Sequence, residues 1–136
     1  MNKNLELALK LSVLNTKMTK SIDAQLSIHG ITFSEFLVIY HLANTSTKTM
    51  RRIDLAEKVA MSASGITRML NPMEKLKIVQ KEVNPRDARV SFVKLTSAGE
   101  ELYKNALKSV NNTTKELFED LYNFDIDQLY KILKKI

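Results

Sequence analysis

Glycine and proline are scarce in this chain, and their scarcity limits the folds that it can adopt. Only 3 Gly and 2 Pro occur among 136 residues, which leaves little of the turn chemistry that a many-stranded sandwich or barrel requires. Long helices are expected instead. Hydrophobic residues make up 44% of the chain and charged residues 26%, as in an ordinary globular protein. The sequence therefore predicts a mainly α fold, with residues 1–136 forming one domain.

The composition also argues against several classes of function. With 0 Cys and 2 His, the chain lacks a disulfide framework and a thiolate nucleophile, and it has few of the ligands that transition metals favour. It contains no phosphate-cradling glycine loop, no zinc pattern and no nucleophile–base pair. No apolar run approaches the length of about 20 residues that crosses a bilayer, and no signal-peptide core is present. We expect a cytoplasmic protein that is not an enzyme, needs no metal or cofactor and does not contact membranes.

The positive charge is concentrated in the middle of the chain. The formal net charge is +6, and residues 51–94 hold ten basic but only five acidic side chains. The segments on either side are nearly neutral. A basic centre between neutral flanks is typical of a module that binds a polyanion such as nucleic acid. A solvated basic face that maintains solubility is the alternative.

Apolar periodicity predicts long helices toward both ends of the chain. Residues 5–28 carry Leu, Met and Ile at helical spacing, and the same spacing recurs in 97–122 and, after Asp125 as N-cap, in 125–136. A further helix begins at Thr32, because Glu35 three residues later completes a capping box. Its segment after Thr32 is apolar almost all round, so this helix is expected to lie in the core.

Two short helices joined by a tight turn are predicted next. Residues 50–60 form an amphipathic helix with Ile53 and Leu55 facing inward, and a second helix follows Ser62 over about 63–75, with Pro72 expected to kink it or end it. The exposed face of the second helix carries small or hydrogen-bonding side chains, namely Ser62, Ser64, Gly65, Thr67 and Arg68. Such a face suits the major groove of DNA. An ordinary surface helix is the alternative.

A β-hairpin follows and is the only sheet-like element that the sequence predicts. Val, Ile and Phe recur on both sides of a turn within 80–94, and the tip carries Arg86, Asp87 and Arg89. An arginine on a protruding hairpin can enter a minor groove, where the narrow channel focuses negative potential. Asp87 is expected to hold the arginine guanidinium through a bidentate pair. A plain exposed ion pair is the alternative and would add little stability.

The middle of the chain resembles the MarR family of bacterial transcription regulators. The matching segments are Leu55-Ala56-Glu57, Met61–Arg68, Glu74-Lys75, Asn84–Arg89 and Leu95–Gly99. The last two contain the family's wing signature, Asp-x-Arg followed by Leu-Thr-x-x-Gly. Two positions depart from the family pattern. Lys77 stands where many members have glycine, and Arg51 stands where threonine is common, so that Thr49 is expected to act as the cap and leave Arg51 and Arg52 free to face phosphate.

The resemblance implies a winged helix-turn-helix over residues 31–96, flanked by dimerisation helices in 1–30 and 97–136. It implies a homodimer with interlocking termini that represses transcription from a pseudo-palindromic operator in double-stranded DNA and is released by a small aromatic or anionic effector ligand. Two recognition helices would then lie about 34 Å apart, one turn of DNA. A ligand-independent or architectural regulator, or a protein-binding adapter, is the alternative.

The expected DNA contacts fall into three groups. Ser64, Thr67 and Arg68 are assigned to the major groove, with Ser62 and Gly65 beside them. Arg89, braced by Asp87 and accompanied by Arg86, is assigned to the minor groove. Backbone phosphates are assigned to Arg51, Arg52, Lys75 and Lys81.

Overall fold

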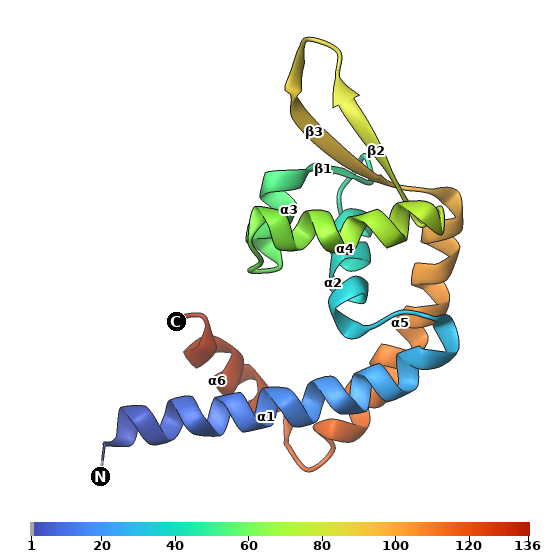
Figure 1. Ribbon diagram of the computed structural model, residues 1–136. Helices are drawn as coiled ribbons and strands as arrows, with labels where there is room; N and C mark the ends of the chain where they lie inside the picture. The colour runs from blue at the N-terminus through green and yellow to red at the C-terminus, as the bar shows by residue number, and fades with distance from the viewer. Residues whose placement is uncertain (1) are drawn as a thin grey trace.

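The computed structural model describes residues 2–136, which contain six α-helices, one 3₁₀ turn and three strands (Figure 1). In chain order the elements are α1 (Lys3–Leu26), the 3₁₀ turn Ser27–His29, α2 (Phe33–Ala43), β1 (Thr49–Arg51), α3 (Arg52–Lys58), α4 (Ala63–Lys75), β2 (Val79–Asn84), β3 (Asp87–Leu95), α5 (Ser97–Leu117) and α6 (Asn123–Leu133). The predicted fold class, mainly α with a hairpin wing, is confirmed.

The sheet has three strands rather than the two of the predicted hairpin. Its order is β1-β3-β2, with both pairs antiparallel, and Met50 of β1 lies opposite the fully buried Val93 of β3. The expectations that the hairpin stands alone and that residues 50–60 form one helix are therefore wrong. Because α3 begins only at Arg52, Ile53 turns outward and is 63% exposed, whereas Leu55 is buried as expected.

The core forms around α2 and fixes the position of α4. In α2, Val38, Ile39 and Leu42 are fully buried, and the inward residues of α3, α4 and β3 pack against them. The start of α2 is the predicted capping box, because the Thr32 hydroxyl accepts from the Glu35 amide at 3.2 Å and the Glu35 carboxylate accepts from the Thr32 amide at 2.9 Å. Burial on several sides of α2 makes it the support for the helix-turn-helix above it.

Helix α4 keeps its predicted bounds. It begins after Ser62 and continues through Pro72 to Lys75, although proline removes one backbone hydrogen bond from the helix. The chain then turns sharply, since Lys77 adopts the left-handed region with φ of 61° and its amide donates to the Glu74 carbonyl at 2.9 Å. This conformation is the one that favours glycine, the residue that the family pattern places here.

Replacing Lys77 with glycine is expected to stabilise the protein. A side chain at positive φ costs about 1–2 kcal/mol, and part of the gain is lost to the greater freedom of glycine in the unfolded chain. We expect the free energy of unfolding to rise by about 0.5–1 kcal/mol, measured as a higher denaturant midpoint with an unchanged slope. Lys75→Gly, inside α4, is the control and should lower the midpoint. A midpoint for Lys77→Gly at or below that of the parent would contradict this explanation.

The C-terminal helices begin and end at different residues from those predicted. Helix α5 stops at Leu117 instead of continuing to 122, and α6 begins at Asn123. Asp125 is not the N-cap of α6 but lies inside its first turn, where its carboxylate accepts from the Tyr122 amide at 3.0 Å. The residues between α5 and α6 form a turn, in which the Leu121 amide donates to the Phe118 carbonyl at 3.0 Å.

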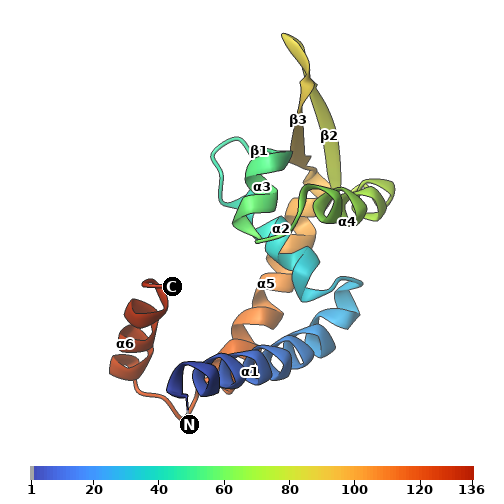
Figure 2. The same ribbon diagram turned by 60° about the vertical axis from the view of Figure 1, so that its left-hand side comes forward.

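Helix α5 runs from the base of the wing, packs against α1 and α2, and reaches the far end of the molecule, where α6 stands apart from the rest (Figures 1 and 2). Within residues 2–136, α6 has no buried residue and α1 has none before Ile22. No single helix of the described chain has the length and apolar character needed to cross a membrane, and α1 with α2 meets those two criteria only as a pair bent by 74°.

Candidate nucleic-acid interface

The helix-turn-helix and the wing lie at the same end of the molecule, away from α1 and α6 (Figure 1). Between them is a hollow of about 200 Å³, lined by Arg51, Arg52, Ile53, Ala63, Arg89, Val90 and Ser91. Three elements supply this lining: the β1–α3 junction, the start of α4 and the wing strand β3. The fold therefore brings together three arginines that are spread over almost forty residues of sequence.

The N-terminal turn of α4 is open to solvent. The Ser62 hydroxyl caps the helix by accepting from the Gly65 amide at 3.0 Å, and it lies 3.3 Å from the Ser64 hydroxyl. A Cβ at Gly65 would lie only 3.0 Å from the Ser62 oxygen, so the small residue protects the cap. Ser64 and Arg68 are exposed, and this face of α4 has the access that groove binding requires.

Thr67 and Arg52 are joined across the helix-turn-helix. Nη1 of Arg52 donates to the Thr67 hydroxyl at 2.8 Å, and that hydroxyl donates in turn to the Ala63 carbonyl at 3.0 Å. Both side chains are half-buried. The sequence suggested each residue as a separate DNA contact, and it carried no signal that the two would touch, because fifteen residues separate them.

Arg51 is already paired within its own chain. Its Nε and Nη2 donate to the two carboxylate oxygens of Asp54 at 2.9 and 3.1 Å. These hydrogen bonds raise the pKa of Arg51 and lower the pKa of Asp54. The expectation that Thr49 caps the helix is wrong: it belongs to β1 and its hydroxyl donates to the Thr47 carbonyl at 3.0 Å, while Arg51 occupies the N-cap position.

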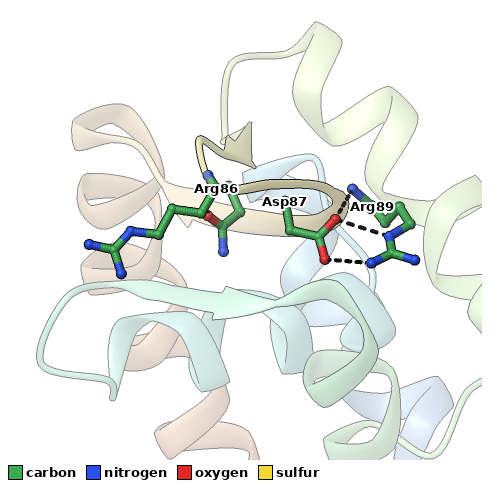
Figure 3. Close-up of polar contacts among 4 residues, drawn as sticks. Arg86, Asp87 and Arg89 are labelled. Carbon is green, nitrogen blue, oxygen red and sulfur yellow. Dashed lines mark hydrogen bonds and ion pairs between the residues drawn. The ribbon is translucent and has the colours of Figure 1, made fainter.

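The predicted pair at the tip of the wing is confirmed (Figure 3). Arg89 donates from Nε and Nη2 to the two carboxylate oxygens of Asp87, at 3.1 and 3.2 Å, and its backbone amide donates to the same carboxylate at 3.0 Å. Hydrogen bonding to the charged carboxylate lowers the pKa of Asp87. The Arg89 side chain is 92% exposed, and Arg86 points away from the pair. The tip therefore presents one braced and one unbraced arginine.

Polar contacts attach the wing to α4 and to the start of α5. Nζ of Lys81 donates to the Asn71 side-chain oxygen at 2.8 Å, which links β2 to α4. At the wing base, the Thr96 hydroxyl accepts from the Gly99 amide at 3.0 Å and also lies 2.5 and 3.0 Å from the carbonyls of Lys77 and Ile78. The threonine of the Leu-Thr-x-x-Gly signature thus joins the residues before β2 to the first turn of α5. Lys75 is exposed at the end of α4.

The interface has the chemistry of binding rather than of catalysis. Its side chains are arginines, lysines and small hydroxyls, which suit phosphate and base edges. Within residues 2–136, no group of three or more His, Asp or Glu side chains is placed to hold a metal ion.

Comparison with known proteins gives a consistent result. The family model described as transcriptional regulator SarA/Rot matches residues 9–106. The HTH-type transcriptional regulator MhqR of Bacillus subtilis is 22% identical over 135 residues, which cover 96% of this chain and 92% of MhqR. The transcriptional repressor MprA of Escherichia coli is also 22% identical, over 90% of this chain and 70% of MprA.

A solved structure of a MarR variant from Escherichia coli, in complex with operator DNA, has the same fold. It superposes with a TM-score of 0.89 at 24% identity, covering 98% of this chain and 95% of that one. The matched family and both relatives are transcriptional regulators rather than enzymes. The chain belongs to the SarA/Rot family of transcriptional regulators, and its fold is the winged helix-turn-helix fold of that MarR structure.

Proposed function

We propose that this protein is a sequence-specific repressor that binds double-stranded DNA as a homodimer. The observation that carries the proposal is the shared placement of the open face of α4, the Asp87–Arg89 wing tip and the arginine-lined hollow at one end of the molecule. The excess positive charge of the chain lies in the same segment, residues 51–94. A basic surface with a projecting helix and hairpin is complementary to adjacent grooves of DNA.

The proposed contacts follow from the position of each side chain. The major groove receives α4 with Ser64, Arg68 and the Arg52–Thr67 pair, while Ser62 and Gly65 lie at its entry. The minor groove receives the wing, with Arg89 held by Asp87 and with Arg86 beside it. Phosphates on either side are assigned to Arg51, Lys75 and Lys81. A phosphate needs positive charge more than a fixed geometry, so an exposed cation such as Lys75 suits it.

The homodimer is proposed from apolar surface that one copy leaves uncovered. The first half of α1 exposes Leu5, Leu7, Leu9, Val13 and Leu14, each 50–59% accessible. At the same end of the molecule, an apolar hollow of about 190 Å³ is lined by Phe118, Leu121, Ile126, Leu129, Tyr130 and Leu133. Apolar patches of this kind mark interaction surfaces. A second copy would cover both and hold two α4 helices about 34 Å apart, one turn of DNA.

Release by a small aromatic or anionic ligand is part of the proposal. Such a ligand acts by favouring a dimer whose two α4 helices are wrongly spaced for the operator. Phe36, Tyr40 and Tyr103 form an aromatic cluster where α2 meets α5, with ring centroids 5.9 to 6.4 Å apart. The cluster joins the helix-turn-helix to the helices proposed for dimerisation, and this is the junction through which ligand release would act.

Selection of genomic fragments by the purified protein tests the proposed function. We expect enriched fragments to share two inverted half-sites with centres 10 to 10.5 base pairs apart. Fragments that bind but share no sequence would identify an architectural protein instead. Failure to bind DNA even at low salt, where phosphate contacts are strongest, would favour a protein-binding adapter.

Arg89→Ala is expected to weaken operator binding by about 1–3 kcal/mol for each half-site, because the wing loses its braced guanidinium. Fluorescence anisotropy on the selected operator measures the change. Lys104→Ala, which removes the same charge from the exposed surface of α5, is the control and should have little effect. Parental affinity in Arg89→Ala would remove the wing from the proposed interface.

A further inference from the structure

The contact between Arg52 and Thr67 changes the roles expected of both residues. Arg52 is the first residue of α3, and its side chain reaches the second turn of α4, where Nη1 lies 2.8 Å from the Thr67 hydroxyl. Arg52 also lines the hollow beside the start of α4. The side chain of Arg52, from α3, therefore contacts the face of α4 that carries Thr67.

The hydroxyl of Thr67 is committed to interactions inside the protein. Its one proton goes to the Ala63 carbonyl at 3.0 Å, and one of its lone pairs receives Nη1 of Arg52. A hydroxyl has one proton to donate, so Thr67 has none left for an acceptor on a base. Bonding back to the carbonyl four residues earlier also fixes its rotamer. Thr67 is thus a rigid acceptor that holds Arg52.

The guanidinium of Arg52 keeps most of its donors. An arginine carries five N–H groups, and the bond to Thr67 uses one of them. Arg51, next to it, differs because two of its nitrogens are bonded to the carboxylate of Asp54. Arg52 therefore presents a fork that is held in place and not neutralised, whereas Arg51 presents a neutralised one.

We propose that Arg52 is a specificity-determining residue that reads a guanine through O6 and N7 in the major groove, and that Thr67 is its positioning residue. The inference rests on the proposed binding of DNA by α4. A half-buried and oriented guanidinium has already lost rotamer freedom, which favours a contact that demands fixed geometry. The bidentate pair of arginine with guanine is such a contact. A contact with phosphate gains less from a fixed orientation of the guanidinium. This assignment replaces the phosphate role that the sequence suggested for Arg52.

Site selection and binding measurements with three variants test the inference. Arg52→Lys keeps the charge but loses the planar fork, Thr67→Val keeps the shape but loses the hydroxyl, and Thr67→Ser restores a hydroxyl. We expect Arg52→Lys to lose preference for one guanine in each half-site and to bind the parental operator about tenfold more weakly per half-site. On an operator in which that base pair is substituted, Arg52→Lys and the parent should bind with the same affinity. Thr67→Val should lose preference at the same base pair, and Thr67→Ser should retain it.

The double variant and the salt dependence complete the test. Because the two residues act as one unit, Arg52→Lys with Thr67→Val should bind no more weakly than the weaker single variant. The dependence of affinity on salt should stay parental, since no phosphate contact is removed. Thermal unfolding of each variant confirms that the fold is intact.

Three results would overturn the inference. Equal weakening of Arg52→Lys on every sequence would make Arg52 a phosphate contact. Loss of preference at two different base pairs would mean that Thr67 reads a base itself. Parental preference in all variants would remove both residues from base reading while leaving the proposed function intact, because that function is judged separately by whether the parent selects an operator at all.

Discussion

Replacing Gly99 with alanine is expected to lower the free energy of unfolding by about 3 kcal/mol, at the upper end for an overpacked site. A Cβ at this position would collide with the Ile78 carbonyl oxygen and would lie 2.5 Å from the Leu95 side chain. The Ile78 carbonyl cannot withdraw freely, because it accepts from the Thr96 amide at 3.1 Å. Relief of the collision would require movement of the base of the wing. Denaturant unfolding measures the loss.

Gly30→Ala is a matched control for the Gly99 substitution. Gly30 has φ of 75°, and nothing lies within 4 Å of the added Cβ. Its replacement should cost only the left-handed penalty, about 1 kcal/mol. If Gly99→Ala destabilised the protein no more than Gly30→Ala does, close approach would not be the reason for glycine at position 99.

Leu129→Glu is expected to produce a monomer that binds the full operator at least about 100-fold more weakly than the parent, because the second half-site no longer benefits from linkage. Leu129 lines the apolar hollow formed by α6 and the residues just before it, and it is 42% exposed in the single chain. A carboxylate there would lose its hydration when a second copy covers it. Sedimentation velocity gives the oligomeric state, and anisotropy gives the affinity.

Gln128→Glu adds the same charge at an exposed position on the other side of α6, and it should remain dimeric with parental affinity. Binding to an isolated half-site should be similar for the parent and for Leu129→Glu, since neither α4 nor the wing is altered. A dimeric Leu129→Glu variant with parental operator affinity would exclude α6 from the subunit interface.

The features that the sequence predicted correctly depend on near neighbours. The capping box of Thr32 and Glu35 and the fork between Asp87 and Arg89 each involve residues two or three positions apart. Such pairs form within one turn of helix or one edge of a hairpin, so local spacing alone indicates them. The left-handed conformation of Lys77 belongs to the same class, because it depends on the end of a single helix.

The features that the sequence did not reveal depend on distant segments. A three-residue strand such as Thr49–Arg51 is too short to show an alternating pattern in the sequence. It forms because it pairs with β3, some forty residues later in the chain. The outward turn of Ile53 follows from the same pairing, and the Arg52–Thr67 bond follows from how two helices meet. The wrong assignment of Asp125 has a local cause, because an acidic residue near the start of a helix fits both the N-cap position and a position inside the first turn.

Helix α5 is long enough to connect the two ends of the molecule. Its 21 residues span about 32 Å at 1.5 Å per residue. One end is clamped to the wing through Thr96, and the other reaches the apolar region near α6. If α5 tilted by about 10° about its far end, the end next to Thr96 would move by about 5 Å, which is more than the rise of one base pair in DNA. In the proposed dimer, a small change in how the two subunits meet would therefore produce a larger shift of the wing along the DNA.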